Sequence, residues 1–574
     1  MLEARNISMD VESGGEVLPL LREVNFCVPP GHFVAIVGPS GCGKTTLLKA
    51  IAGIRDVTDG AFFWSGRNLE EDGDFEPGEV GYVPQFSIAY DELTVDESVE
   101  NAARLRTVLE GDELDELIDS VLRETGLEEI ADRPVRLLSG GQKRRLALAM
   151  ELVSHPHVLL CDEVTSGLDP RSEREIVELL HQLSRREGRV VISVTHSLAQ
   201  AELYDSIMVM IHGNLAYHGS PAVMPHYFGV KTMEEVYPRL ALRAPREWHA
   251  SWMKHRGEYY ARLEKEHIEK YRESGTPPPP VHPVESEDVA EPSVMRQMLM
   301  MLRRRFSLLL RDRSQLVLQV AMMVLFPILV ALFSSKGQEQ LLSLTDSAGS
   351  DMMAEVQALQ AMAEVRAKVG SAVSGIIMFQ VILLGLMGSN NAAREIAAER
   401  LILEKEKFAG ASPLAYIGAK LIYLALLVLL QSLWMFAFVQ YCWPLRGDEM
   451  NHLLFLLLAN AAMTSVCLGI SANSRTPEQA SLLSIYLVGF QLPLSGAVLA
   501  LPDTIERMTQ PFISAYWAWS GSIQGGLDSE VLKAVNSIVQ TSFQPSGLCL
   551  AVLLAHIGVG IVLTYVGVRR TFWE

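Results

Sequence analysis

The sequence predicts an α/β domain followed by an all-α transmembrane domain of six helices. In the first half, short apolar runs alternate with helical patterns, and a glycine-rich loop lies between one such run and the helix after it. In the second half, six apolar stretches are each long enough to cross about 30 Å of hydrocarbon as a helix. The chain has 574 residues, 49% hydrophobic content and a mean hydropathy of +0.18, which indicates more than one domain and a membrane protein.

The glycine-rich loop, Gly38–Thr45, has the pattern of a phosphate-binding loop. It follows the apolar run Val34–Val37 and precedes a helical pattern, and this strand–turn–helix context distinguishes it from a chance glycine-rich turn. Lys44 is expected to reach the β- and γ-phosphates of ATP, and Thr45 to offer its hydroxyl to Mg²⁺. The other residues expected to surround the phosphates, mainly through backbone N–H groups, are Gly38, Ser40, Gly41, Cys42, Gly43 and Thr46.

An acidic pair, Asp162 and Glu163, follows the apolar run Val158–Cys161. The run predicts a buried strand of a parallel sheet, and open α/β sheets place their ligands at the carboxyl ends of such strands. One carboxylate can hold a metal ion while the next accepts a proton from an attacking water. Without the phosphate loop, two solvated acids at a strand end would be the preferred interpretation.

The run Leu138-Ser139-Gly140-Gly141-Gln142 lies between the phosphate loop and the acidic pair. These three elements in this order resemble the ATP-binding cassette (ABC), in which this signature motif closes over ATP held by a second cassette. The resemblance implies that Ser139, Gly140, Gly141 and Gln142 contact the nucleotide of a partner chain. Since this chain has one cassette with every motif intact, the expected partner is a second half-transporter, most simply a second copy.

The same resemblance implies roles for the other motifs. Asp162 would bind Mg²⁺, and Glu163 would be the general base that polarises the attacking water. Gln85 matches the glutamine that contacts Mg²⁺ and water and faces the membrane domain, and Asp169 matches a loop at the dimer seam. His196 matches the switch histidine that contacts the γ-phosphate, although a lone histidine after a strand is otherwise more often structural.

The six apolar stretches predict a membrane domain whose two ends carry basic residues. Arg303–Arg305 precede the first stretch, and Arg569 and Arg570 follow the last. Basic residues at both ends place both termini and the ATPase domain in the cytoplasm. The expected location is the cell (inner) membrane, as a multi-pass protein. Polar residues within the stretches could line a substrate path, but hydrogen bonds between helices are the commoner explanation. The stretches lie near Leu316–Phe333, Val369–Gly388, Leu421–Val439, Leu453–Ile470, Ala480–Leu501 and Leu548–Val568, and their polar residues are Gln319, Gln380, Gln431, Asn460, Gln491 and His556.

The expected domain order is an ABC nucleotide-binding domain over residues 1–230, a charged and proline-rich linker over 231–294, and the six-helix permease domain over 295–574. Within the linker, the part from Pro245 onward is expected to form an amphipathic helix. Residues 295–313 would form an amphipathic connecting helix. A cassette followed by six helices resembles the G (White) subfamily and bacterial relatives with ABC-2 type permeases. Glu395–Ser412 would contain the segment that couples to the cassette, although its alternating charges could equally form a solvated helix face.

That resemblance implies an ATP-driven transporter that works as a dimer and exports a lipid-like or amphipathic substrate across the bilayer. The alternative is a membrane-anchored ABC ATPase with a signalling or mechanical role and no transported substrate. Six spans and a longest outer loop of about 45 residues favour transport. The net charge of −19 argues against a nucleic-acid partner, and the six cysteines show no metal-binding spacing. No aromatic residue lies between Ser8 and Glu23 to stack on a base, so the preference for ATP over GTP stays open.

Overall fold

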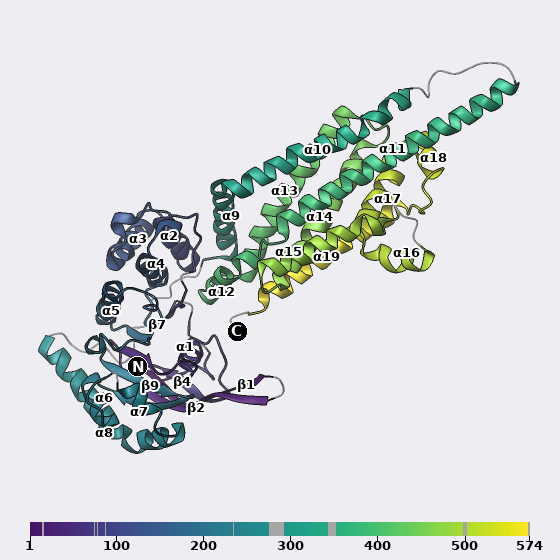
Figure 1. Cartoon of the computed structure of the whole chain (residues 1–574). Helices are drawn as coiled ribbons and strands as arrows, with labels where there is room; N and C mark the ends of the chain where they lie inside the picture. The colour runs from purple at the N-terminus through teal and green to yellow at the C-terminus, as the bar shows by residue number, and fades with distance from the viewer. Residues whose placement is uncertain are drawn as a thin grey trace. The chain divides into compact units, whose positions relative to one another are not determined.

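The computed structural model describes residues 1–571 except 14–15, 74, 77, 87, 234, 275–291, 343–351 and 498–501 (Figure 1). The chain divides into two compact units. The N-terminal unit comprises Met1–Ser293 together with Lys405–Ala411, and the helical unit comprises Val294–Glu404 and Ser412–Glu574. The predicted α/β fold of the first half and the helical fold of the second are both confirmed.

A six-stranded sheet with the order β10-β9-β3-β8-β7-β6 forms the centre of the N-terminal unit. The strands are parallel except for β10, which runs antiparallel to β9. Every residue of β3, β7 and β8 is buried, as apolar runs covered on both faces require. The strands are β3 (Phe33–Val37), β6 (Val80–Val83), β7 (Val158–Asp162), β8 (Val190–Val194), β9 (Ser206–Ile211) and β10 (Asn214–Gly219).

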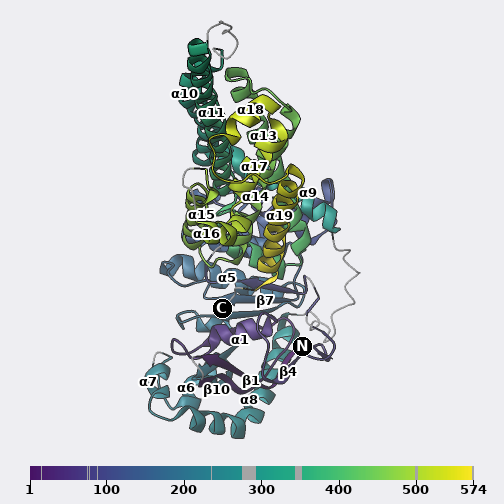
Figure 2. The same cartoon turned by 90° about the vertical axis from the view of Figure 1, so that its right-hand side faces the viewer.

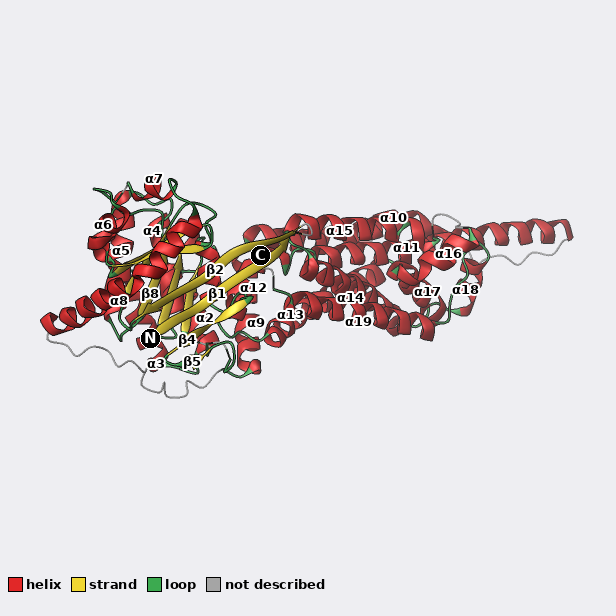
Figure 3. Ribbon diagram, turned by 90° about the horizontal axis from the view of Figure 1, so that it is seen from below, coloured by secondary structure: helices red, strands yellow, loops and turns green. Residues whose placement is uncertain are grey.

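A second sheet of four antiparallel strands, in the order β2-β1-β4-β5, completes the strand content described for this unit. Its first two strands form a long two-stranded ribbon, which Figure 3 shows in yellow. The strands are β1 (Leu2–Ser13), β2 (Glu16–Val28), β4 (Asp59–Trp64) and β5 (Arg67–Asn68). The helices are α1 (Lys44–Ile51), α2 (Val95–Arg106), α3 (Asp112–Thr125), α4 (Gly140–Leu152), α5 (Pro170–Arg185), α6 (Met224–Phe228), α7 (Val236–Leu240) and α8 (Pro245–Ser274).

Helix α8 packs against the last strand of the large sheet (Figure 2), although residues 231–294 were expected to be a linker. Its Trp248 and Trp252 are fully buried, and the ring of Trp252 lies 5.7 Å from that of Tyr217 on β10. Burying two indole rings stabilises this docking by several kcal/mol, more than a solvated linker would offer. The beginning of the predicted linker is therefore wrong, and the proline run Pro277–Pro280 lies outside the described residues.

Acid is expected to destabilise the N-terminal unit through His218 on β10. Its ring lies 3.1 Å from Ser206 Oγ and 3.2 Å from Tyr260 Oη of α8, and burial lowers its pKa to about 3. The unfolded chain takes up a proton near pH 6.5 while the folded unit keeps the ring neutral. Stability therefore falls by about 1.4 kcal/mol for each pH unit below about 6.5, until the pH reaches the folded-state pKa.

Thermal unfolding midpoints of the full chain at pH 7.5 and 5.5 check this expectation. His218→Asn, which cannot titrate, should lose less of its midpoint between the two pH values than the unchanged protein loses. His155→Asn is the matched control, because His155 is exposed. An identical loss in His218→Asn and in the unchanged protein would contradict the assigned origin of the pH dependence.

The helical unit is a bundle of long apolar helices (Figure 1) with short helices inserted between α15 and α19. Helix α9 precedes the bundle. Helix α12 (Arg400–Phe408) begins in the helical unit, and its residues from Lys405 onward belong to the N-terminal unit. The others are α9 (Val294–Arg311), α10 (Arg313–Leu342), α11 (Met352–Ala392), α13 (Pro413–Cys442), α14 (Glu449–Asn473), α15 (Pro477–Gln491), α16 (Asp503–Thr509), α17 (Ser514–Gly526), α18 (Ser529–Asn536) and α19 (Ser546–Arg569).

Five helices of the described residues are long and apolar enough to cross a membrane, one fewer than predicted. The predicted fifth span, Ala480–Leu501, is wrong as a single helix, because α15 ends at Gln491 and a 3₁₀ turn begins at Pro493. Proline has no N–H group to continue the helical hydrogen bonds. The 15 residues of α15 extend about 23 Å, short of the roughly 30 Å of hydrocarbon.

Close backbone contact and polar pairs hold the bundle together. A Cβ atom on Gly560 of α19 would collide with the backbone of Ser465 on α14, so only glycine allows this approach. Asn391 on α11 and Gln431 on α13 exchange hydrogen bonds of 2.8 and 3.1 Å, and Asn460 on α14 donates to Gln431 at 3.3 Å. Interhelical hydrogen bonding therefore accounts for Gln431 and Asn460, as the commoner interpretation of such residues expects.

Candidate active site

The phosphate loop lies between β3 and α1, with Lys44 as the first residue of the helix. The buried Lys44 ammonium group donates to the carbonyl oxygens of Gly38 and Pro39 at 3.0 and 3.1 Å. A Cβ atom on Gly38, where φ is +153°, would collide with the carbonyl oxygen of Met210, so the turn requires glycine. The loop thus has the closely turned backbone and the positively charged side chain that binding of a triphosphate requires.

Two of the three expected Mg²⁺ ligands lie in contact with each other. Thr45 Oγ1 donates to Asp162 Oδ1 at 2.9 Å, although 117 positions separate the two residues. Burial raises the pKa of Asp162, while the hydrogen bond from Thr45 opposes that rise. Hydroxyl and carboxylate oxygens are ligands that Mg²⁺ prefers, so this donor set fits the ion that the motifs imply. Gln85, the third expected ligand, lies beside Glu163 instead.

Glu163 is held between two of the other predicted site residues. Gln85 Nε2 donates to its Oε2 at 3.0 Å, and His196 Nε2 lies 2.8 Å from its Oε1. Glu163 also has a φ of +49°, a left-handed conformation that costs a non-glycine residue of order 1 kcal/mol or more. Strain of this kind is typical of functional positions, where the surrounding structure holds a side chain in one direction.

The signature run forms the N-terminus of α4 as a capping box. Ser139 Oγ accepts a hydrogen bond from the backbone N–H of Gln142 at 3.3 Å, and Gln142 Oε1 accepts one from the backbone N–H of Ser139 at 3.0 Å. Ser139 and Gly140 are exposed. Each of these two bonds joins the side chain of one signature residue to the backbone N–H of the other. The motif therefore presents the positive end of a helix on the surface of the unit.

Asp169 caps the next helix, α5. Its carboxylate accepts hydrogen bonds from the backbone N–H groups of Arg171 and Ser172, each at 3.1 Å, and from Ser172 Oγ at 2.6 Å. The bond from the Ser172 hydroxyl is the main cause of the lowered pKa of this exposed carboxyl. Asp169 is thus fixed on the surface by its own helix, and no direct role with nucleotide follows from these contacts.

A buried ion-pair cluster was missed by sequence reasoning. Glu151, near the end of α4, lies 2.9 Å from Arg106 Nη2 and 3.1 Å from Lys405 Nζ, and all three side chains are buried. Burial alone would raise the pKa of Glu151, but the two cations hold that pKa below its ordinary value. The cluster fixes Lys405, part of the segment expected to couple to the cassette, to the helix that begins with the signature motif.

These motifs and contacts define an ATP-binding cassette ATPase domain. Residues 21–166 match the family model of the ABC transporter ATPase domain, described as "ABC transporter", and residues 296–518 match the model described as "ABC-2 type transporter". The chain thus carries an ABC transporter ATPase domain followed by an ABC-2 type membrane domain, and it is an integral membrane protein.

Known proteins are similar to this chain over most of its length or over a shorter part of it. The ABC transporter ATP-binding/permease protein Rv1747 of Mycobacterium tuberculosis is 28% identical over 516 residues, which cover 88% of this chain and 55% of that protein. ABC transporter G family member 13 of Arabidopsis thaliana is 34% identical over 227 residues, 38% of this chain and 33% of that protein. The chain therefore spans about half the length of the first relative and less of the second.

The solved structures include a dimeric post-hydrolysis state of the ATP-binding cassette MJ0796 bound to ADP and Pi. It is 28% identical, covers 38% of this chain and 99% of its own, and has a TM-score of 0.35.

Proposed function

We propose that this chain is one half of an ATP-driven transporter that exports an amphipathic or lipid-like molecule. The observation that carries the ATPase part is the position of Glu163 between Gln85 and His196, at the end of the strand that presents Asp162. A carboxylate fixed in this way can accept a proton from a water molecule that attacks the γ-phosphate. His196 and Gln85 are then positioned to orient that water and to hold the carboxylate while the proton moves.

ATP binding would be shared between the phosphate loop of one chain and the signature motif of another. Lys44 would neutralise the β- and γ-phosphates, and Mg²⁺, held by Thr45 and Asp162, would neutralise charge on the transferred group. The exposed N-terminus of α4, with Ser139 as its cap, would receive the γ-phosphate of the partner's nucleotide. A second copy supplies the same two surfaces, so a homodimer with two equal sites is the simplest assembly.

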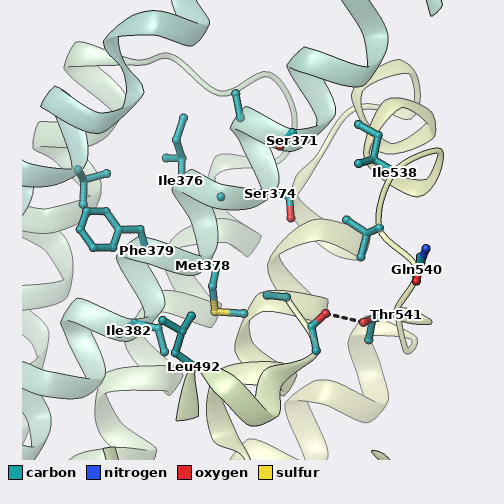
Figure 4. Close-up of a pocket in the computed structure, with 16 residues that line it drawn as sticks. Ser371, Ser374, Ile376, Met378, Phe379, Ile382, Leu492, Ile538, Gln540 and Thr541 are labelled. Atoms are coloured by element: carbon teal, nitrogen blue, oxygen red, sulfur yellow. Dashed lines mark hydrogen bonds between the residues drawn. The ribbon is translucent and has the colours of Figure 1, made fainter. Parts of the chain in front are cut away.

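The substrate class is inferred from a cavity in the helical unit. Its volume is about 790 Å³, and α11, Val330 of α10 and the segments after α15 and α18 line it (Figure 4). Its wall is mainly apolar, with Phe379, Met378 and Ile382 on one side, while Ser374 and Gln540 offer polar atoms. Among the lining residues that the structure describes, none has a charged side chain. A neutral molecule with an apolar body and a few hydrogen-bonding groups fits this chemistry.

The expected orientation places the ATPase domain and both termini in the cytoplasm. Arg303 and Arg569 are exposed, the first on α9 and the second at the end of α19. Basic residues at both ends of a membrane domain favour the cytoplasmic side. The cytoplasm also contains ATP, so this orientation gives the ATPase domain access to its nucleotide.

Reconstituted vesicles test the transport function. We expect ATP-dependent movement of a fluorescent lipid or a neutral amphipathic compound, and at least a tenfold reduction by Gly375→Trp, which fills the cavity. Gly375 lines the cavity, and a Cβ atom there meets nothing within 4 Å, so the larger side chain has space in the fold. Gly489→Trp is the matched control, because Gly489 also has open space around its Cβ but lies outside the cavity.

The comparison also separates transport from the alternative of an ATPase without transported substrate. Basal ATP turnover that no compound stimulates, and that Gly375→Trp leaves unchanged, would favour the signalling or mechanical role. Equal loss of transport in both tryptophan variants would instead remove the cavity as the substrate site.

A further inference from the structure

A tyrosine on the neighbouring strand contacts the carboxylate expected to bind Mg²⁺. Tyr82 lies on β6, and the parallel register pairs it with Leu160 of β7. Side chains alternate along a strand, so Asp162, two positions after Leu160, projects from the same face as Tyr82. The Tyr82 hydroxyl donates to Asp162 Oδ2 at 3.3 Å, and both side chains are almost fully buried.

The hydrogen bonds of Tyr82 and Thr45 engage different oxygens of the same carboxylate. Thr45 Oγ1 lies on Oδ1 and Tyr82 Oη on Oδ2, so the plane of the carboxylate is fixed from two directions. Thr45 is itself an expected Mg²⁺ ligand, whereas Tyr82 lies on β6, next to the strand that bears Asp162, and its hydroxyl contacts the carboxylate. Partners of this second kind orient metal ligands, and their loss typically weakens metal binding by about 10- to 100-fold.

The ring of Tyr82 has a partner from a distant part of the sequence. Phe408, in the Lys405–Ala411 segment of the N-terminal unit, packs edge-on against it with ring centroids 6.2 Å apart. The edge-to-face arrangement is favourable for aromatic rings and restricts how the tyrosine can tilt. β6 also leads directly to Gln85, so the strand that bears Tyr82 serves both the Mg²⁺ ligand and the glutamine beside Glu163.

We propose that Tyr82 is a positioning residue for Mg²⁺ binding: its hydroxyl fixes the Asp162 carboxylate, and Phe408 holds its ring in place. This inference rests on the proposed function, because it assumes that the phosphate loop binds a nucleotide with a divalent cation. It assigns to a residue outside the recognised motifs a part in setting the affinity for the metal. It also connects the Lys405–Ala411 segment to the metal ligand, because Phe408 contacts Tyr82 and Tyr82 contacts Asp162.

Metal affinity is measured directly on the full chain in detergent, with Mn²⁺ as the probe. Free Mn²⁺ is followed by electron paramagnetic resonance in the presence of a non-hydrolysable ATP analogue, and binding of a fluorescent ATP analogue is measured separately in EDTA. Tyr82→Phe keeps the ring and removes only the hydroxyl. It is expected to raise the Mn²⁺ dissociation constant by about 10- to 100-fold and to change nucleotide affinity in EDTA by less than twofold.

Two further variants define the specificity of the effect. Tyr204→Phe is the matched control, since Tyr204 is a buried tyrosine of the same unit whose ring stacks on Phe33. It should leave both affinities within twofold of the unchanged protein. Phe408→Leu keeps the tyrosine hydroxyl but removes the ring contact, and it should weaken Mn²⁺ binding by at least about threefold.

The outcomes separate this inference from the proposed function. If the unchanged chain binds no Mn²⁺ with the nucleotide analogue, the proposed function fails. If it does, and Tyr82→Phe binds Mn²⁺ within twofold or loses nucleotide affinity in EDTA to the same extent, the positioning role is overturned. An effect in Tyr82→Phe with none in Phe408→Leu overturns the role of Phe408. Should Tyr82→Phe not fold, unchanged Mn²⁺ affinity in Phe408→Leu overturns the proposal.

Discussion

Glu163→Gln is expected to lower steady-state ATP turnover by at least about 100-fold while nucleotide binding is retained. The amide of glutamine cannot accept a proton from the attacking water, yet it has nearly the same size and still offers one oxygen as an acceptor. Gln85 Nε2 and His196 Nε2 lie 3.0 and 2.8 Å from the two carboxylate oxygens, so at least one of these contacts can persist. Loss of the chemical step with binding preserved is the result that a general base requires.

Turnover is measured as phosphate release by the reconstituted chain, and binding with a fluorescent ATP analogue. Glu178→Gln is the matched control, because Glu178 is a half-exposed glutamate of the same unit whose one described ion pair joins it to Arg174 on its own helix. That variant should keep turnover within about twofold, as surface pairs contribute little. Turnover in Glu163→Gln close to that of the control would show that another group accepts the proton.

The sequence predicted most of the candidate site because its residues follow consecutive strands of one parallel sheet. The phosphate loop and His196 follow β3 and β8, and Asp162 is the last residue of β7. These three strands are adjacent in the sheet, so their carboxyl ends meet. The contact between Thr45 and Asp162 agrees with this expectation. The arrangement of Gln85 was less accessible, because its bond to Glu163 depends on loop conformation that no periodic pattern specifies.

Contacts between distant segments could not be predicted in the same way. Lys405 and Phe408 belong to a charged stretch that has the composition of a solvated helix face, yet they contact Glu151 and Tyr82. Nothing in the local pattern distinguishes a lysine that pairs with a buried glutamate from one in water. The available signal was Glu151 itself, an acid within an otherwise apolar run after the signature, which demands a buried cationic partner.

Two errors in the predicted fold have local physical causes. The stretch after residue 230 is rich in charge, which suggested a linker, but Trp248 and Trp252 bury large apolar surfaces and fix α8 to the sheet. In the membrane domain, the apolar composition on both sides of Pro493 suggested one continuous span. Proline has no N–H group to continue the helical hydrogen bonds, and α15 ends at Gln491. In both cases a few strongly directing residues overrode the average composition of the segment.

Glu395→Ala is expected to destabilise the helical unit by about 3–5 kcal/mol, the usual cost of removing one partner of a buried ion pair. Arg305 Nε and Nη2 donate to the two oxygens of Glu395 at 2.5 and 2.8 Å, and Lys420 Nζ lies 2.9 Å from Oε1. Lys420 keeps a second partner, Glu399, at 2.6 Å, so Arg305 loses most in the variant. The thermal unfolding midpoint in detergent should fall by several degrees.

Replacing both partners distinguishes an uncompensated charge from a general loss of packing. The double variant Arg305→Met, Glu395→Leu should recover most of the lost midpoint, because a buried pair exchanged for apolar side chains of similar volume is often neutral in stability. Glu364→Ala, which removes an exposed pair with Lys368, should change the midpoint by little. If the double variant is as unstable as Glu395→Ala, the carboxylate contributes through shape and hydrogen bonding to α13, and the buried charge of Arg305 is not the cause of the destabilisation.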